Sequence, residues 1–112
     1  MHAPLSISFN DLERSHAVEA RARETAERLM RQHERVTRCH ITVDGRAEDG
    51  DGGAVRIHVC MPGAQIHAAR RARTCEEAAL AQALSEAYLD IRRQLRDLDG
   101  QRSTALIPVR PL

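Results

Sequence analysis

The chain contains no lysine and no tryptophan, and its aromatic residues are limited to Phe9 and Tyr88. Without lysine, no Schiff base can form on a side-chain amine, which excludes that class of enzyme chemistry. With only two such rings in 112 residues, a surface that binds nucleic acid by stacking successive bases is also excluded. These two absences narrow the functions that the remaining residues can support.

Long apolar segments and paired cysteines are also missing. No stretch approaches the roughly 18 apolar residues of a membrane span, and the polar start of the chain, MHAP, does not resemble a signal peptide. The three cysteines, Cys39, Cys60 and Cys75, include no C-x-x-C pair, so reduced thiols are expected in place of a disulfide framework. Together these features predict a cytoplasmic protein.

The charge balance is close to neutral. All 17 basic residues are arginine, and they oppose 16 acidic residues for a formal net charge of +1. This is not the strongly basic balance of a non-specific nucleic-acid binder. A hydrophobic fraction of 42% and a charged fraction of 29% are typical of a soluble folded chain, and the length predicts one domain.

Apolar residues recur with the periods of four strands and two helices. The expected elements are a strand at 5–9, a helix at 15–33, strands at 36–44, 54–61 and 65–69, and a helix at 74–99. Ser15 is a good N-cap for the first helix, and Thr74 with Glu77 predicts a capping box for the second. Gly100 is a typical C-terminal stop for that helix.

The element order is β-α-β-β-β-α, which predicts an α+β two-layer sandwich. Two amphipathic helices would bury their apolar stripes on one face of a four-stranded sheet and leave the other face in water. Pro62-Gly63 is expected to form the hairpin turn between the last two strands. Residues 1–99 are predicted to form the domain and residues 100–112 a flexible tail.

Five segments of the chain carry a family resemblance. They are 5–15 (LSISFNDLERS), 35–43 (RVTRCHITV), 55–59 (VRIHV), 63–68 (GAQIHA) and 92–95 (RRQL). In order and spacing they resemble the ribosome hibernation promoting factor/RaiA family, in its short type. The resemblance implies a fold like that of double-stranded-RNA-binding domains, without enzymatic activity or cofactor. It also implies binding to the small ribosomal subunit where mRNA and tRNA would sit, which silences ribosomes under stress.

The resemblance further indicates which residues would contact rRNA. Six positions that are basic in typical members match Thr25, Arg28 and Arg31 on the first helix and Asp90, Arg93 and Asp97 on the second. The two aspartates reverse the expected charge, so the groove between the helices is expected to be basic on one side only. With neighbouring arginines as local support, the candidate rRNA contacts are Arg21, Arg28, Arg31, Arg70, Arg71, Arg92, Arg93 and Arg96.

Arginines of the first helix have two interpretations. Heptad spacing predicts a line of side chains at Arg14, Arg21, Arg28 and Arg35, which could follow a phosphate backbone. Favourable i,i+4 ion pairs are also expected at Glu19–Arg23, Glu24–Arg28, Glu27–Arg31 and Glu34–Arg38. A helix stabilised by such pairs needs no ligand, so both interpretations stay open.

Charge is distributed unevenly along the chain. Residues 14–38 carry seven arginines against four glutamates, and residues 54–75 carry four arginines and no acid. Residues 39–53 and 76–99 are each net negative by three charges. A polyanion is therefore expected on the first helix and on the last two strands, including the run Arg70-Arg71-Ala72-Arg73, which is expected in a loop.

Strand alternation directs His40, His58 and His67 to the exposed sheet face, together with Cys60. Imidazole and thiolate can bind zinc, but no C-x-x-C or H-x-x-x-H spacing accompanies them, so solvated histidines are favoured and no metal is expected. Cys75 stands in the first turn of the second helix, a place that raises thiol reactivity, but no base partner is evident. No P-loop, G-x-G-x-x-G or G-x-S-x-G motif is present, so we do not expect an enzyme.

Two hypotheses follow. The favoured one is a short, ribosome-associated hibernation factor that binds the small subunit through rRNA phosphates and blocks translation by occupancy. The alternative is a divergent member of the family that has lost ribosome binding and acts as a protein-interaction or regulatory module, through the open sheet face or the acidic second helix. The charge around Asp90 and Asp97 distinguishes them: arginines that close the groove in space favour the first.

Overall fold

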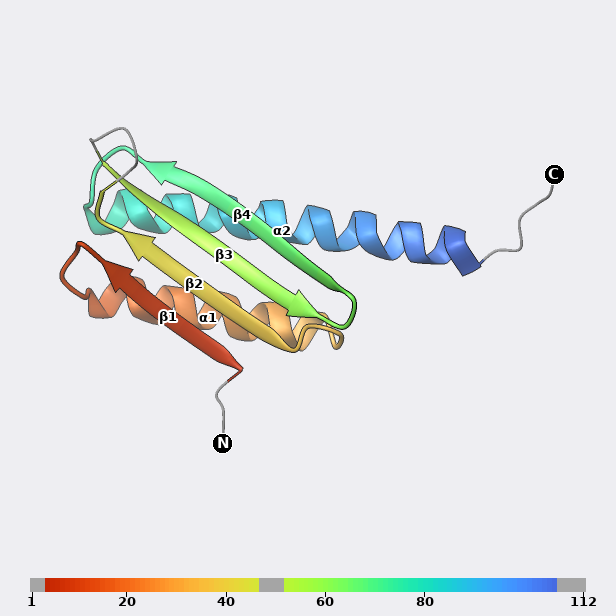
Figure 1. Cartoon of the computed structure of the whole chain (residues 1–112). Helices are drawn as coiled ribbons and strands as arrows, with labels where there is room; N and C mark the ends of the chain where they lie inside the picture. Colours follow the sequence, from red (N-terminus) through yellow and green to blue (C-terminus); the bar gives the residue numbers. More distant parts are fainter. Residues whose placement is uncertain (1–3, 47–51, 107–112) are drawn as a thin grey trace.

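The computed structural model describes residues 4–46 and 52–106, with side chains as far as Leu98. Its elements, in chain order, are β1 (Leu5–Asn10), α1 (His16–Gln32), β2 (Arg38–Asp44), β3 (Gly53–Met61), β4 (Ala64–Ala72) and α2 (Glu77–Leu106). The strands form one sheet in the order β1-β2-β3-β4, and both helices lie on one face of it (Figure 1). The predicted α+β two-layer sandwich is therefore confirmed.

Strand register aligns the apolar positions of the sheet. β1 pairs with β2 in parallel, and the other neighbouring strands are antiparallel. Ile7 stands opposite Ile41, which in turn stands opposite Ile57, and the latter two are fully buried. Because side chains alternate along a strand, the polar residues between these positions point away from the helices.

Each helix contributes an apolar stripe to the core. The buried residues of α1 are Val18, Ala22, Ala26 and Leu29. Those of α2 include Leu80, Leu84, Ala87, Ile91 and Leu95. Removing a large apolar side chain from water contributes about 1.5–3 kcal/mol, so these stripes hold both helices on the sheet. The Ser15 hydroxyl accepts a 3.2 Å hydrogen bond from the Val18 N–H, which confirms the predicted N-cap.

The second helix differs from its prediction at both ends. The Leu80 N–H bonds to the Glu76 carbonyl, whereas the Thr74 hydroxyl accepts from the Glu76 N–H ahead of the helix. The capping box at Thr74 is therefore wrong, and so is the stop at Gly100, since α2 continues to Leu106. A helical glycine costs only about 1 kcal/mol relative to alanine, which neighbouring turns can offset. Of the predicted tail, residues 107–112 lie outside the described residues.

The fourth strand is longer than the expected 65–69. β4 pairs with β3 as far as Ala72, so Arg70 and Arg71 belong to the sheet and the expectation of a loop there is wrong. The extra pairing satisfies backbone groups that a loop would leave to water. The Pro62-Gly63 turn is confirmed: Gly63 has a φ of +80°, the left-handed conformation that this turn position requires.

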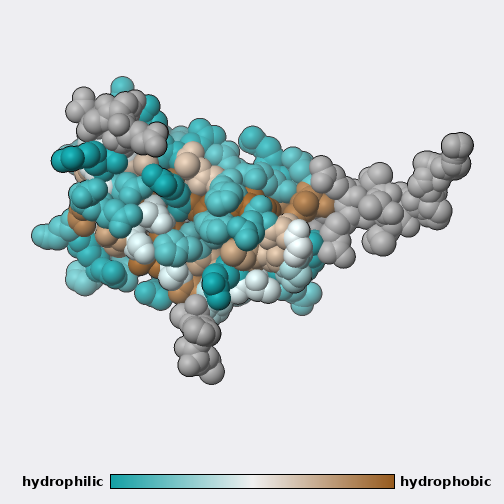
Figure 2. All heavy atoms as spheres, viewed as in Figure 1, coloured by the Kyte–Doolittle hydropathy of each residue, from teal (hydrophilic) through white to brown (hydrophobic). Residues whose placement is uncertain are grey.

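The sheet face that the helices leave open is polar. In Figure 2, teal side chains cover much of this face, and brown core residues are visible between them. The one large apolar side chain described as well exposed is Leu89 on α2. Within the part of the chain that the structure describes, no helix is both long and apolar enough to cross a membrane.

Candidate functional site

The two helices run side by side in the same direction and contact each other near both ends of α1 (Figure 1). Near their N-termini the Ser15 hydroxyl donates to the Glu77 carboxylate at 2.9 Å. Near the C-terminal end of α1 the Tyr88 hydroxyl donates to the side-chain carbonyl of Gln32 at 3.2 Å. We call the outer surface along this line of contact the helix seam.

Two arginines, one from each helix, meet over a single tyrosine ring at the helix seam. The guanidinium carbons of Arg28 on α1 and Arg92 on α2 each lie 5.7 Å from the centroid of the Tyr88 ring. Only 8% of Tyr88 is exposed, so the ring is a fixed support, and each cation–π contact contributes about 0.5–1 kcal/mol at an exposed site. Glu24 lies 4.0 Å from Arg28, a long exposed pair that contributes little. We call Arg28, Tyr88 and Arg92 the arginine–tyrosine cluster.

Two further candidate arginines extend this cluster along the helices. Arg21 stands two turns before Arg28 on α1, and Arg96 stands one turn after Arg92 on α2. Residues at these spacings share one side of a helix, and both side chains are exposed. The helix seam therefore carries four of the eight predicted contacts.

Arg31 and Arg93, which match the family's basic positions, point elsewhere. At 3.6 residues per turn, Arg93 is rotated by about 100° from Arg92 and Arg31 by about 60° from Arg28, and both rotations lead away from the seam. Both are exposed. On α2, the arginine that contacts the seam is thus Arg92, the immediate neighbour of the one that the resemblance indicates.

The two acids of α2 face β4 and not α1, so the expectation that they lie in the groove between the helices is wrong. The Arg70 guanidinium donates two hydrogen bonds, of 2.7 and 3.0 Å, to the Asp90 carboxylate. These hydrogen bonds lower the pKa of Asp90 below its usual range, and their effect outweighs the opposing effect of desolvation. Asp97 lines a shallow hollow against β4, beside Gln65 and Gln94.

Two more candidate arginines, Arg70 and Arg71, also lie away from the helix seam. Arg70 is engaged by Asp90, and Gln94 donates a 2.7 Å hydrogen bond to the His67 carbonyl of β4. Arg71 is the next residue of the strand, so it points to the opposite, open face. The eight candidate arginines therefore lie on several surfaces, and the largest group lies along the helix seam.

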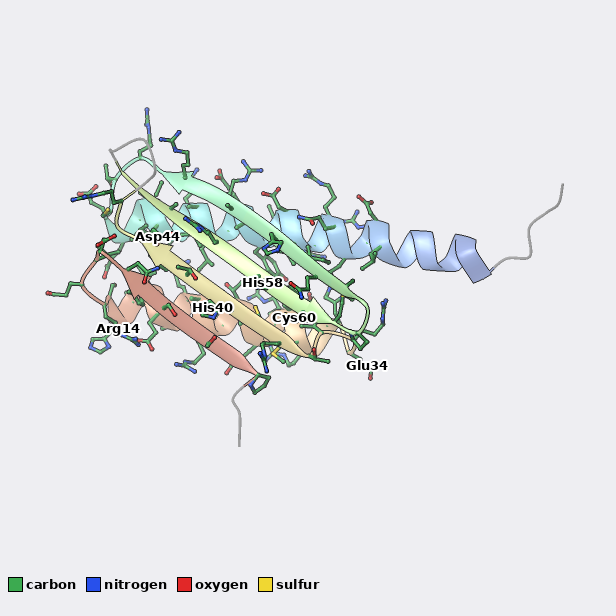
Figure 3. The ribbon with its side chains drawn as sticks, viewed as in Figure 1. Arg14, Glu34, His40, Asp44, His58 and Cys60 are labelled. Carbon is green, nitrogen blue, oxygen red and sulfur yellow. The ribbon has the colours of Figure 1, made fainter. Side chains whose placement is uncertain are left out.

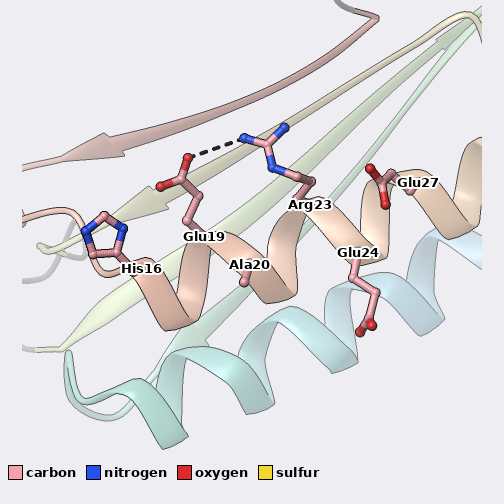
Figure 4. A pocket seen from close by; sticks show the side chains of 6 residues that line it. All are labelled: His16, Glu19, Ala20, Arg23, Glu24 and Glu27. Carbon is pink, nitrogen blue, oxygen red and sulfur yellow. Dashed lines mark hydrogen bonds and ion pairs between the residues drawn. The ribbon is translucent and has the colours of Figure 1, made fainter.

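The side of α1 that faces β1 has a different charge balance. The predicted line of four arginines is wrong, because Arg14 precedes α1 and Arg35 follows it. Arg14 lies 5.4 Å from the Phe9 ring centroid and pairs with Glu19 at 2.8 Å. Arg23 pairs with the same carboxylate at 3.4 Å (Figure 4). A hollow on the outer surface of α1 is lined by His16, Glu19, Ala20, Arg23, Glu24 and Glu27, of which Glu24 points toward α2 (Figure 4). With three glutamates and one arginine, it disfavours phosphate.

Two of the four predicted ion pairs on the first helix are present, Glu19–Arg23 and Glu24–Arg28. The other two, Glu27–Arg31 and Glu34–Arg38, are not among the ion pairs of the described residues. The second of these cannot form on a helix at all, because α1 ends at Gln32. The interpretation that ion pairs occupy the arginines of this helix, so that it needs no ligand, therefore holds only for part of its surface.

The sequence did not single out Tyr88 as part of the site. One signal was present, since Tyr88 stands four residues before Arg92 and such side chains lie next to each other on a helix. No signal indicated that Arg28 would contact the same ring, because that contact depends on how α1 packs beside α2.

The predicted histidine arrangement on the sheet is confirmed. His40 stands opposite His58, and His58 opposite His67, on three adjacent strands. Among the described residues, no three His, Cys, Asp or Glu side chains are arranged to hold a metal ion. Cys75 precedes α2, so its predicted place in the first turn of that helix is wrong. Its thiol donates to the Gly45 carbonyl at 3.2 Å, a contact between the segment ahead of α2 and the residue that follows β2.

Comparison with known proteins gives a family match and fold matches. The family model described as sigma 54 modulation protein / S30EA ribosomal protein matches residues 5–103. A ribosomal subunit interface protein from Coxiella burnetii has a similar structure, with 15% identity and a TM-score of 0.63 over 86% of this chain and 97% of that one. The N-terminal domain of Protein Y from Thermus thermophilus gives 16% identity and a TM-score of 0.56 over 79% of this chain and 93% of its own. No curated protein matches the sequence.

Proposed function

The chain belongs to the sigma 54 modulation protein / S30EA ribosomal protein family, and on this basis we propose that it is a ribosome-associated factor that binds the small ribosomal subunit. The contact would be made with rRNA phosphates along the helix seam. Binding there would block translation by occupancy, which requires no catalytic group and no cofactor. The names of its structural relatives, a ribosomal subunit interface protein and Protein Y, agree with this role.

The arginine–tyrosine cluster is the observation that supports the proposal most. Arg28 and Arg92 come from different helices and are held by one buried ring, so two permanent positive charges are positioned before any ligand arrives. Guanidinium groups offer forked donors that match phosphate oxygens. Side chains that are already ordered lose less conformational entropy on binding than free ones do.

The position of the acids gives further support. Asp90 is neutralised by Arg70 on the β4 side of α2, so its negative charge does not oppose a phosphate at the seam. An acidic, open groove at Asp90 and Asp97 would have favoured the interaction-module hypothesis. The structure has arginines along the seam instead.

Co-sedimentation with small ribosomal subunits at two salt concentrations tests the proposal. The double variant Arg28→Ala, Arg92→Ala should bind at least about tenfold more weakly, since a charge-assisted hydrogen bond contributes about 1.5–3 kcal/mol. Its log–log salt slope should become shallower by about 0.7–0.9 per lost contact. The matched control is Arg14→Ala, Arg23→Ala, which removes the same charge from the glutamate-rich side and should stay close to wild type.

Two outcomes would contradict the proposal. One is a wild-type chain that stays in the supernatant at low salt, which would favour the interaction-module hypothesis. The other is equal loss of binding in the test variant and the control, which would mean that total charge matters and the seam does not.

A further inference from the structure

The face of the sheet that carries no helix presents a row of imidazoles. His40 on β2, His58 on β3 and His67 on β4 occupy directly paired positions of the antiparallel ladder. We call these three residues the histidine row; it crosses the sheet at right angles to the strands. Figure 3 labels His40, His58 and the neighbouring Cys60 on the open face.

The rings of the row have a defined arrangement. The imidazoles of His58 and His67 are stacked, with centroids 4.3 Å apart and planes inclined by 10°. Together with Thr42 and Arg56, the three histidines line a shallow hollow of about 450 Å³ on the open face. Four of the eight residues that line the hollow, the three histidines and Arg56, carry nitrogen in their side chains.

Among the residues that the structure describes, the charged groups around the row are mostly positive. By strand alternation, Arg38 on β2, Arg56 on β3 and Arg71 on β4 point to this face. The acid described at an outward position of the four strands is Asp44, whose carboxylate accepts from Asn10 at 3.1 Å and pairs with Arg56 at 3.3 Å. An anion that approaches the open face therefore meets no unpaired acid among its described residues.

The remaining neighbours of the row are neutral. β1 contributes Ser6 and Ser8, β3 contributes the Cys60 thiol, 3.9 Å from His58 Nε2, and β4 contributes Gln65. The helices pack on the other face of the sheet. Among the described residues, the charged side chains on this face are therefore the arginines and the paired Asp44.

Hydrogen bonds of the row fit the charged form of histidine as well as the neutral one. Ser6 Oγ lies 2.8 Å from His40 Nδ1, and Ser8 Oγ lies 3.1 Å from His40 Nε2. A hydroxyl can donate or accept, so both bonds persist when the ring gains a second proton. His58 Nε2 lies 2.9 Å from Gln65 Oε1, an acceptor that suits a protonated nitrogen.

We propose that the open face is a second RNA-binding surface, whose affinity for the phosphate backbone rises as the histidine row becomes protonated. Histidine is the side chain that changes charge between about pH 5 and pH 8. Two stacked imidazolium rings repel each other, and a phosphate in the hollow relieves that repulsion, so binding of RNA and uptake of protons favour each other. This surface lies opposite the helix seam and does not depend on the proposed contact there.

Binding of a short single-stranded RNA oligonucleotide, measured by fluorescence anisotropy between about pH 8 and pH 5.5, tests the proposal. Wild-type affinity should rise roughly three- to tenfold as the pH falls through the range in which histidine gains its charge. The variant His58→Gln, His67→Gln should lose this rise and keep its affinity at pH 8. The control His16→Gln, His33→Gln removes as many imidazoles from the helical side and should retain the full rise.

Two further measurements distinguish RNA binding at the open face from RNA binding at the helix seam. The variant Arg28→Ala, Arg92→Ala should bind RNA more weakly at every pH and keep the same pH response, so a failure at the seam is distinguishable from a failure here. On addition of RNA, the imidazole NMR signals of His58 and His67 should shift more than those of His16 and His33.

Three results would overturn the proposal. One is wild-type affinity that does not change with pH. Another is an equal loss of the pH response in the test variant and in the control. The third is an acidic peptide of the same net charge that binds with the same pH response and equal affinity, which would make the occupant an acidic protein segment.

Discussion

The helix seam and the open sheet face are both cationic, but they carry different kinds of charge. At the seam, Arg28 and Arg92 keep their charge at all physiological pH values and are held over Tyr88. On the sheet, the histidine row carries charge that depends on pH, and the acid among the described outward residues, Asp44, pairs with Arg56. One small α+β sandwich can therefore offer a polyanion two faces, one constant and one adjustable, because helices and sheet expose different residues to solvent.

The two surfaces also depend differently on packing. The seam needs two elements in a fixed relation, since its cluster is built from α1 and α2 together. The row needs only the sheet ladder, since its members stand in directly paired positions. Mutations that loosen the helices should therefore affect one surface and leave the other.

The largest loss of stability and of small-subunit binding is expected from Tyr88→Ala. Truncation of a buried aromatic residue costs about 3–5 kcal/mol of unfolding free energy, and here it also removes the support of both arginines. Urea denaturation should report the loss of stability, and small-subunit binding should fall with it at a temperature where the variant is still folded. The pH-dependent binding of RNA by the sheet should remain.

Tyr88→Phe is the matched control. It keeps the ring under Arg28 and Arg92 and removes only the hydrogen bond to Gln32, which contributes about 1 kcal/mol. Small-subunit binding should be nearly unchanged. Equal loss of binding in the Phe and Ala variants would mean that the hydroxyl and not the ring positions the arginines.

A smaller effect on small-subunit binding is expected from single substitutions of two neighbouring arginines of α2. Arg92→Ala should weaken small-subunit binding about tenfold, because it removes a charge-assisted contact of about 1.5–3 kcal/mol. Arg93→Ala should change binding less than about threefold, since this side chain is rotated away from the seam. Co-sedimentation of the two variants decides between the geometry and the family resemblance, which indicates Arg93.

A still smaller effect is expected from Asp90→Asn. Hydrogen bonds from Arg70 lower the pKa of Asp90, so the pair stabilises the fold above the ordinary carboxyl pKa, and this contribution is lost as the pH falls through the lowered value. The variant should melt slightly below wild type at neutral pH, and the difference should vanish in strong acid. Thermal melts across the acid range measure this. Stronger ribosome binding by the variant would place Asp90 near the seam after all.

The smallest effect on the protein is expected from chemical modification of its cysteines, which compares the two faces of the sheet. Burial raises the pKa of the Cys39 thiol to about 12, so iodoacetamide should not modify Cys39 in the folded protein. Cys60, half-buried on the open face, should react without loss of fold, and mass spectrometry after proteolysis identifies the site. Because the pKa of Cys39 is raised by folding, stability should fall as the pH rises from about 9 towards 12. Rapid modification of Cys39 at neutral pH would contradict its burial.

Much of the fold was predictable because local patterns agreed with each other. Alternation at Ile7, Ile41 and Ile57, the cap at Ser15 and the turn at Gly63 each indicated the element that the structure contains. The errors lie at element ends. A glycine at position 100 and a threonine at position 74 are typical of helix ends, but neighbouring residues outweighed them.

The candidate site was predictable only in part. The family resemblance indicated Arg28, Arg92 was added as local support, and strand alternation indicated the histidine row. The acids were assigned to the wrong side of α2, because charge reversal at Asp90 can be seen in a sequence and its pairing with Arg70 cannot.

The sequence by itself determined which residues share a helix side or a strand face, since those relations depend only on the periods of 3.6 and 2. It therefore determined the core stripes, the outward direction of the histidines and the excess of arginine on α1. Tertiary structure alone decided which faces meet: that Arg28 and Arg92 contact one ring, that Asp90 contacts β4, and that the imidazoles of His58 and His67 stack. The Arg28–Tyr88, Arg70–Asp90 and His58–His67 contacts join residues that are 60, 20 and 9 positions apart, and the packing of the helices and the pairing of the strands determine them, because local preference does not reach across such distances.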